Sequence, residues 1–344
     1  SVTGVQTCAL PISGYIGKRL SNRKMYGYNV PATHDVWINN FLVTKEDFIQ
    51  VGDNTYNSIN KAQAAIEENG TGTMILLKDV EVNELSTIEA NKNVTLDLNG
   101  HVLTLTRGIV NYSNLTVIDS SNGKTGMINN LKTNAIANRA GSLTVDGTYI
   151  KSSNSAIYVA DTSTTINLIN GAKLEGTTGL SSDIANTEVI VNNSTITGTS
   201  RGIQTNGQSA TITLNTGSIT STEGFAVDIR NHYSKFIMDN GTVTGRDYGI
   251  YNYGQKNTIT INGGTVTSTN GDGIRNDSSY DTNYRPVITI NDGLVQGSRY
   301  GVYNYYCDLI INGGEVKTTS TSRDNYAIYS GSWGGVTLKD NAFV

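Results

Sequence analysis

The sequence is poor in cysteine, proline and charge, and each shortage excludes a class of protein. With only two cysteines, a disulfide framework cannot hold the fold together. Charged residues make up 16% of the chain and the formal net charge is -4, so the basic excess of a nucleic-acid-binding protein is missing. No apolar run is long enough to span a membrane. The low proline content, three residues against 37 glycines, fits strands that keep their backbone donors and turns that need positive φ.

What the sequence has instead is an internal repeat. Its clearest copy is ITINGGTV at 259–266, and the copies follow one another at intervals of about 23 residues, with two expansions. Apolar and polar residues alternate within a copy, which is strand spacing. A turn such as Gly263-Gly264 separates two short strands, and a third strand follows later in each copy. The copies begin at Leu143, Ile166, Val189, Ile212, Phe236, Ile259, Ile288, Leu309 and Val336.

This repeat predicts an all-β, right-handed parallel β-helix solenoid with about 23 residues and three short strands per coil. A single unit has nothing to pack against, whereas stacked units bury one aliphatic column on the next. Each inward Ile or Val then contributes about 1.5–3 kcal/mol. A leucine-rich repeat is disfavoured because its L-x-x-L-x-L-x-x-N pattern is absent and β-branched residues dominate.

The segments before the repeat have separate interpretations. Residues 1–13 look like a translated sequencing adapter, so we exclude them as an artefact. Residues 14–55 form an irregular segment, in which Asn39-Asn40 between two apolar arms predicts a hairpin over 36–43, with a loose linker as the alternative.

An amphipathic helix is predicted over 56–72. Ile59, Ala62 and Ile66 lie on one helical face, while Ser58 can cap its start and Gly70 its end. A helix directly before the first strand can cover the apolar end of a solenoid. We expect the β-helix to occupy 73–344 and to be truncated at its C-terminus, because the chain stops inside the coil VTLKDNAFV.

Several segments carry a family resemblance. YNSINKAQAAI, MILLKDV and NVTLDLNGHVLTL, between 56 and 105, resemble the opening of parallel β-helix domains in surface or secreted proteins of Gram-positive-type bacteria. The later ITINGGTV coils resemble the pectate-lyase-like superfamily in general. The resemblance covers about 36–344 and implies an extracellular or cell-surface, adhesin-like or carbohydrate-associated bacterial protein. Because that superfamily also contains polysaccharide lyases and glycoside hydrolases, fold alone leaves enzyme and binder open.

Carboxylates give weak candidates for metal binding and catalysis. Asp97, Asp119 and Asp146 close the first strand of successive coils, and stacked carboxylates can hold Ca²⁺. Amides follow at most later copies, so we favour a hydrogen-bonded ladder without metal or any other cofactor. Asp272 in NGDGI resembles part of the acid block of polygalacturonase-type hydrolases, but the rest of that block is missing and a simple turn is favoured. Asp272 and Asp146 are thus the weak candidates for a catalytic acid.

Aromatic residues form the stronger candidate site. One outward slot of the third strand holds tyrosine in several coils, and both expanded coils, near 276–287 and 318–326, lie beside it. Exposed rings with hydrogen-bonding neighbours are how proteins hold sugars. The alternative is that tyrosine simply suits a strand surface and pairs along the stack. The candidate ligand-binding residues are Tyr251, Tyr253, Arg275, Tyr280, Tyr284, Arg299, Tyr303, Tyr305, Tyr329 and Trp333.

Three functions stay open at this point. We favour a non-catalytic, adhesin-like protein of the bacterial surface or exterior that binds a glycan, or another host or cell-surface component, through its Tyr-rich face. A polysaccharide lyase or glycoside hydrolase is one alternative, and a structural spacer of a larger surface protein is the other. We expect no nucleic-acid partner, no membrane insertion, and a monomer that is part of a longer chain.

Overall fold

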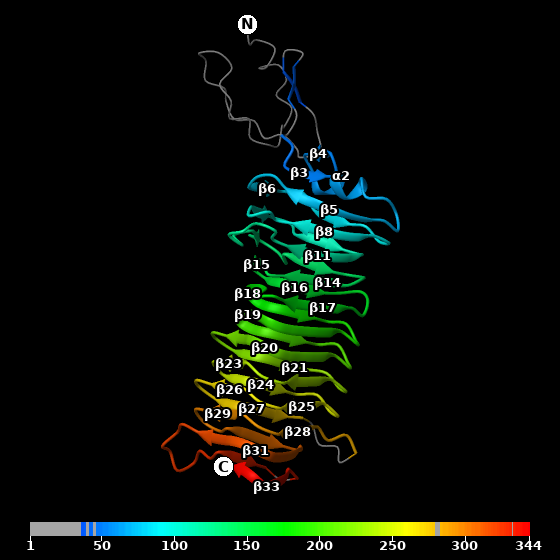
Figure 1. Cartoon of the computed structure of the whole chain (residues 1–344). Coiled ribbons are helices and arrows are strands. Elements are labelled where there is room, and N and C mark those ends of the chain that lie inside the picture. The colour runs from blue at the N-terminus through cyan, green and yellow to red at the C-terminus, as the bar shows by residue number, and fades with distance from the viewer. Residues whose placement is uncertain (1–35, 39–40, 44–45, 279–282, 332) are drawn as a thin grey trace.

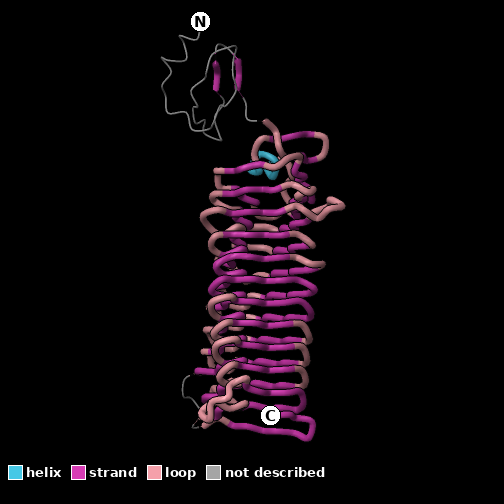
Figure 2. The backbone as a smooth tube through the Cα atoms, turned by 90° about the vertical axis from the view of Figure 1, so that its left-hand side faces the viewer, coloured by secondary structure: helices cyan, strands magenta, loops and turns pink. Residues whose placement is uncertain are grey.

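The computed structural model describes residues 36–38, 41–43, 46–278, 283–331 and 333–344. The predicted artefact at 1–13 lies outside these residues. Nearly all of the described chain is a stack of short parallel strands that forms a rod, with β5 near one end and β33 at the other (Figures 1 and 2). The predicted parallel β-solenoid is therefore confirmed.

The first strands of the coils build one side of the rod, each paired in parallel with the next. Four of the strands in this series, β19, β20, β31 and β33, run on into the second strand of their coil. The series is β5 (Thr71–Leu76), β8 (Asn93–Asp97), β11 (Asn114–Ile118), β14 (Leu143–Asp146), β17 (Thr165–Ile169), β19 (Glu188–Thr205), β20 (Thr211–Ser221), β22 (Lys235–Met238), β25 (Thr258–Ile261), β28 (Val287–Ile290), β31 (Asp308–Thr318) and β33 (Gly335–Phe343).

The second and third strands build the other two sides. Second strands are β6 (Val80–Val82), β9 (Val102–Leu105), β12 (Met127–Asn130), β15 (Tyr149–Ser152), β18 (Lys173–Ser182), β23 (Thr242–Gly245), β26 (Thr265–Ser268) and β29 (Leu294–Gly297). Third strands are β7 (Ser86–Ile88), β10 (Ile109–Asn111), β13 (Ile136–Asn138), β16 (Ser155–Val159), β21 (Phe225–Ile229), β24 (Tyr248–Asn252), β27 (Asp272–Asp277), β30 (Val302–Tyr305) and β32 (Ile328–Ser330). The ends of β18 and β19 supply this position in their own coils.

The register confirms the repeat residue by residue. Each predicted start is paired with the next one along the chain, from Leu143 with Ile166 through to Leu309 with Val336. The alternating pattern places Ile259, Ile261 and Val266 in the core. One aliphatic column therefore packs on the next through the whole stack, as the hydrophobic effect requires of a unit that has no core of its own.

The predicted helix is present but shorter than 56–72. Helix α2 (Ile59–Ala64) begins after Ser58, whose side chain accepts the Asn60 backbone N–H at 3.2 Å. It ends well before Gly70 because the chain must turn into β5: Asn69 adopts φ 59° and the Asn93 N–H donates to the Gly70 carbonyl at 2.9 Å. Its apolar face belongs to the same core as the coils. The role of α2 as a cover for the end of the solenoid stays a prediction.

The segment before the helix contains two hairpins. Strands β1 (Val36–Ile38) and β2 (Phe41–Val43) pair antiparallel, as the predicted hairpin requires, and its turn residues lie outside the described ones. Residues 49–55, which we expected to be irregular, and Tyr56, which we expected to begin the helix, form a second hairpin of β3 (Ile49–Val51) and β4 (Asn54–Tyr56). β3 also pairs antiparallel with β5, so burial of Ile49 against the first coil orders this stretch. None of the helices in the described ranges is long and apolar enough to cross a membrane.

Candidate functional site

The outward slot of the third strand is continuous through the C-terminal half of the rod. Glycines precede the buried Ile or Val of this strand, and a Cβ on Gly249 or Gly273 would meet the next coil's carbonyl oxygen at 2.5 or 2.7 Å. This close approach fixes the strand register. The register then lines up, coil after coil, Gln204, Asp228, Tyr251, Arg275, Tyr303 and Tyr329.

Aromatic rings and a guanidinium stack along this slot. The ring centres of Tyr248 and Tyr251 are 5.5 Å apart. The Arg275 guanidinium lies 5.3 Å from the Tyr248 ring centre and 4.1 Å from that of Tyr303. The Tyr303 and Tyr329 rings are 4.8 Å apart and within 6° of parallel. We call this surface the aromatic face and define it as Phe225, Tyr248, Tyr251, Arg275, Tyr300, Tyr303 and Tyr329.

The stacking decides which atoms the aromatic face presents. Rings that pack on one another use their flat sides internally, and each such pair contributes about 0.5–1.5 kcal/mol. The ring edges then remain for a ligand, together with those phenol hydroxyls that have no partner in the described chain. A ligand on this face therefore meets rigid rings through their edges and hydrogen-bonding groups.

The tyrosine hydroxyls along the rod differ in whether the protein supplies them with a partner; on the aromatic face that of Tyr300 donates to the Asp324 carbonyl at 3.3 Å. In the N-terminal half, the Tyr158 hydroxyl donates to Asp183 at 2.7 Å and that of Tyr149 to Glu175. On the aromatic face, the hydroxyls of Tyr251, Tyr303 and Tyr329 make no hydrogen bond to any residue that the structure describes. Burial raises the pKa of Tyr251 and of Tyr303, so these phenols stay protonated and can donate.

Asp272, the weak catalytic candidate, is a buried anchor for two arginines. Its Oδ1 accepts from Arg299 Nε at 2.8 Å, and its Oδ2 accepts from Arg299 Nη2 at 2.7 Å and from Arg275 Nη1 at 3.0 Å. Arg275 Nε also donates to Asp277 at 2.6 Å. The hydrogen bonds with Asp272 raise the pKa of Arg299. Because both oxygens are engaged and the side chain is fully buried, Asp272 positions the arginines of the aromatic face.

Asp228 also holds two arginines, but through only one of its oxygens, and the sequence pattern did not single it out. Its Oδ2 accepts from Arg201 Nε at 2.5 Å and from Arg230 Nε at 2.9 Å, and the side chain is fully buried. The glycine signal of the third strand is absent from its coil, where Ala226 and Val227 stand before Asp228. Asp228 precedes Tyr251 by one repeat in the sequence, and this separation could have been used to predict that it occupies the outward slot.

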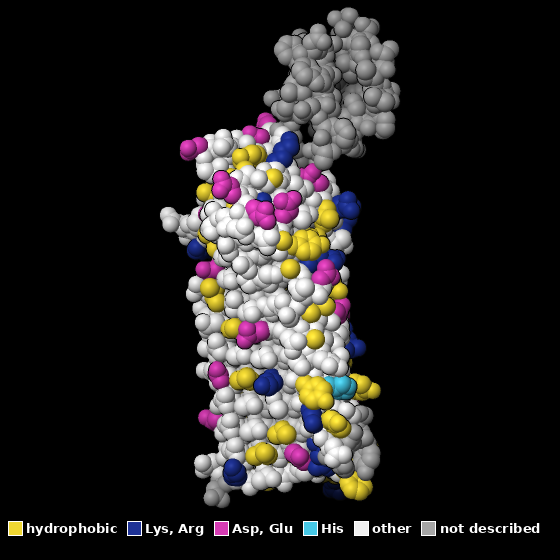
Figure 3. Space-filling view, turned by 90° about the vertical axis from the view of Figure 1, so that its right-hand side faces the viewer, with side chains coloured by type: hydrophobic (Ala, Val, Ile, Leu, Met, Phe, Trp, Pro, Cys, Tyr) yellow, Lys and Arg dark blue, Asp and Glu magenta, His cyan; other side chains and the backbone are white. Residues whose placement is uncertain are grey.

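The predicted ligand-binding residues fall into two groups. The aromatic face brings together Tyr251, Arg275, Tyr303 and Tyr329. Arg299 pairs with Asp272, which also pairs with Arg275. The ring centre of Tyr305 lies 6.4 Å from that of Tyr303. Three others lie in the turns that follow the third strands, where Tyr253 is 55% exposed and Trp333 60%, with Tyr284 close by. Apolar and basic side chains gather along the lower right-hand edge of the rod in Figure 3. The last predicted residue, Tyr280, lies outside the described residues.

The acidic candidates for calcium act as hydrogen-bond acceptors of the turns. The register pairs Ile118 with both Asp97 and Asp146, so Asp119 lies one residue beyond the predicted column. Asp97 Oδ1 accepts backbone N–H groups of Asn99 and Ser120, both at 2.9 Å. Asp146 accepts from the Asn170 amide at 2.8 Å. The described residues include no cluster of three or more His, Cys, Asp or Glu that could hold a metal ion.

The amide ladder predicted for the later coils is present from Asp239 to Asn312, whereas Asn192, at a shift in the register, accepts from the Thr216 hydroxyl at 3.3 Å instead. Asn262 donates to Asp239 at 2.8 Å, Asn291 to Asn262 at 2.7 Å, and Asn312 to Asn291 at 2.6 Å. Each amide in this run thus donates to its neighbour in the preceding coil, which is how a repeated turn satisfies its polar groups.

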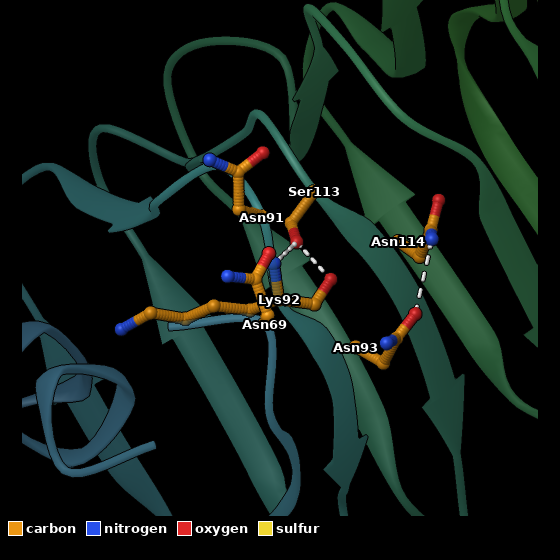
Figure 4. Close-up of a pocket in the computed structure, with 6 residues that line it drawn as sticks. All are labelled: Asn69, Asn91, Lys92, Asn93, Ser113 and Asn114. Carbon is orange, nitrogen blue, oxygen red and sulfur yellow. Dashed lines mark hydrogen bonds between the residues drawn. The ribbon is translucent and has the colours of Figure 1, made fainter. Parts of the chain in front are cut away.

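A polar cleft near the N-terminal end was not foreseen from the sequence. It is built from the turns before the first strands, and the Asn114 amide donates to Asn93 at 3.0 Å across it (Figure 4). The Lys92 ammonium turns away to the Gln63 carbonyl at 2.9 Å. The lining residues are Asn69, Asn91, Lys92, Asn93, Ser113 and Asn114. This cleft has no aromatic side chain, so it offers hydrogen bonds without ring contacts.

Comparison with protein-family models, with curated proteins and with solved structures finds no match. Function is therefore inferred from the geometry of the aromatic face.

Proposed function

We propose that this protein is a non-catalytic, adhesin-like protein of the secreted or cell-surface type that binds carbohydrate along its aromatic face. One observation carries the proposal: Tyr251, Tyr303 and Tyr329 share one outward column, and their hydroxyls have no hydrogen-bond partner within the described chain. By contrast, the hydroxyls of Tyr149 and Tyr158 in the N-terminal half donate to protein carboxylates. Unpaired phenols on rigid rings suit a ligand that is rich in hydroxyl groups.

The stack also lowers the cost of binding. Rings held between neighbouring rings and Arg275 lose little rotamer freedom when a ligand arrives, and preorganisation of this kind improves affinity. Neighbouring coils are about 4.8 Å apart, so the hydroxyls form a row along the rod. A row favours an extended chain of sugars over a single compact molecule.

The alternatives find less support in the site. Hydrolysis or lyase chemistry would need a carboxylate that can reach a substrate, whereas Asp272 is buried between two arginines and Asp146 accepts from the Asn170 amide. A spacer would not need three aligned tyrosines whose hydroxyls have no partner in the described chain.

The proposal is tested by removing only the hydroxyls. In the triple variant Tyr251→Phe, Tyr303→Phe, Tyr329→Phe, we expect binding on a glycan array to weaken at least about tenfold, since each lost hydrogen bond costs about 0.5–1.5 kcal/mol. The thermal unfolding midpoint should stay unchanged, because the stacked rings are kept and these hydroxyls have no partner among the described residues.

Tyr158→Phe is the matched control. It removes a hydroxyl from the same outward slot in the other half of the rod, where the group donates to Asp183. Glycan binding should then equal that of the unmodified protein. The proposal fails if the triple variant binds like the unmodified protein, or if the unmodified protein binds no glycan on the array.

A further inference from the structure

The turn that precedes each first strand changes character along the rod. The residue two positions before that strand adopts a left-handed conformation in many coils, and we call this position the left-handed corner. In the N-terminal half it is held by Asn69, Asn91, Gly141 and Asn186, with φ between 59° and 68°, and near the middle of the rod by Ser209, with φ 56°. In the C-terminal half it is held by Tyr233, Lys256, Tyr306 and Trp333, with φ of 62°, 52°, 55° and 74°.

Backbone geometry alone does not explain the second set. Asparagine tolerates the left-handed region, whereas a bulky side chain rarely adopts it. The corner itself is the same in both halves, since the Asn186 N–H donates to the next coil at 2.8 Å and the Tyr233 and Lys256 N–H groups do so at 3.0 and 2.8 Å. Strain of this kind at one repeated position points to a use for the side chains.

Lys256 is the distinctive member of the corner. Its ammonium lies 4.4 Å from the ring centre of Tyr284 and 5.8 Å from that of Tyr233. Both rings are exposed, by 38% and 46%. Within the described chain Lys256 forms no ion pair with a carboxylate, whereas Arg275 and Arg299 are both paired with Asp272. An exposed cation is therefore held in place by two rings and keeps its charge available.

We propose that Lys256, flanked by Tyr233 and Tyr284, is a subsite for an anionic group carried by the bound glycan, a sulfate ester or a carboxylate. The subsite rests on the proposed carbohydrate binding and gives it a specificity. The ammonium donates charge-assisted hydrogen bonds to the anion, and the two rings contact the sugar that carries it. The corner directly follows the third strands, so one chain of sugars can contact both it and the aromatic face.

Three polymers with the same backbone test the subsite: dextran, dextran sulfate and carboxymethyl dextran. We expect the unmodified protein to bind dextran sulfate or carboxymethyl dextran at least about tenfold more tightly than dextran, the gain of one charge-assisted hydrogen bond. The preference should shrink as salt is added. Comparing the two charged polymers shows whether sulfate or carboxylate is the better ligand.

Lys256→Asn isolates the role of the side chain. Asparagine occupies this corner at Asn69, Asn91 and Asn186, so the fold is kept and its unfolding midpoint should not fall. We expect this variant to bind charged and neutral dextran equally. Lys173→Gln, at an exposed lysine on a second strand, is the control and should keep the preference.

The subsite is overturned if Lys256→Asn keeps the preference, if the unmodified protein binds neither charged polymer, or if oligothymidylate binds as tightly as the charged dextrans. These outcomes are separate from failure of the proposed function. If glycan binding falls in the triple Phe variant while Lys256→Asn changes nothing, the aromatic face stands and the anionic subsite does not.

Discussion

At the scale of single residues, Asp119 shows how this fold uses a buried carboxylate. Its Oδ1 accepts from Gly100 N at 2.8 Å and Ser121 N at 3.0 Å, and its Oδ2 accepts from Gly126 N at 2.5 Å. Burial by itself would raise the pKa of this carboxyl, but the hydrogen bonds from Ser121, Gly126 and Gly100 outweigh burial, so the pKa lies below its ordinary value. The charged form is therefore the one that stabilises the turn.

This residue predicts a loss of stability in acid. Because the folded-state pKa of Asp119 is lower than the unfolded-state value, its contribution is complete above about pH 4 and is lost as the pH falls through the lowered pKa. Asp119→Asn should lower the free energy of unfolding at pH 7 by about 1–3 kcal/mol, since a side-chain N–H would then face backbone N–H groups. Urea unfolding of the unmodified protein and of Asp119→Asn at pH 7, 5 and 3 measures the stability difference and its dependence on pH. If both proteins lose the same free energy of unfolding in acid, this role of Asp119 is contradicted.

At the scale of the coil, one close contact fixes the third strand. Gly273 lies where an added Cβ would approach the Gly301 carbonyl oxygen to 2.7 Å and that of Gln296 to 2.9 Å. The alternation of the sequence then turns Ile274 inward and Arg275 outward. The position of the arginine on the aromatic face thus depends on the absence of a side chain two residues earlier.

Gly273→Ala should therefore destabilise the protein by about 1–3 kcal/mol, as overpacking does in a close-packed interior. Gly123→Ala is the control, because its nearest neighbour would be Thr125 Cγ2 at an ordinary 3.5 Å. Thermal unfolding of both variants measures the difference. If the Gly273→Ala protein is as stable as the Gly123→Ala protein, the neighbouring coil can shift to make room for a methyl group without lowering the free energy of unfolding.

At the scale of the whole molecule, the rod is a stack in which each coil packs on its neighbours. Stability in such a stack is close to a sum of neighbouring contacts, so damage stays near its source. Ile261 lies in the core column between Met238 and Ile290. The aromatic face spans several coils of the same region, so its geometry depends on all of them being folded.

Ile261→Asp should bury an unpaired charge and unfold the coils around it, at a cost of several kcal/mol. Hydrogen exchange should then lose protection in β22, β25 and β28, while β8 and β11 near the other end keep theirs. Thr260→Asp, on the outward side of the same strand, should leave protection unchanged. Loss of protection through the entire rod would instead show that it unfolds as one unit.

The period, the inward columns and the outward slot follow from the amino-acid sequence alone. Alternating apolar residues and recurring glycines repeat at one interval, and a repeated local pattern has one way to stack. For this reason the repeat is sufficient to place Tyr251, Arg275, Tyr303 and Tyr329 in one column. The end of α2 was missed, because the turn into β5 overrides local helix preference.

What the side chains of that column do is set by contacts between coils in the folded rod. Asp272 and Asp228 each pair with one arginine close by in the sequence and with a second one 27 residues away in the neighbouring coil, and this second pairing does not follow from local sequence. The same holds for the stacked rings, for the hydroxyls left without a partner, and for Lys256 between two tyrosines. A periodic sequence specifies its own stacking, whereas charge pairing and ring contacts depend on distances that exist only after the coils have stacked.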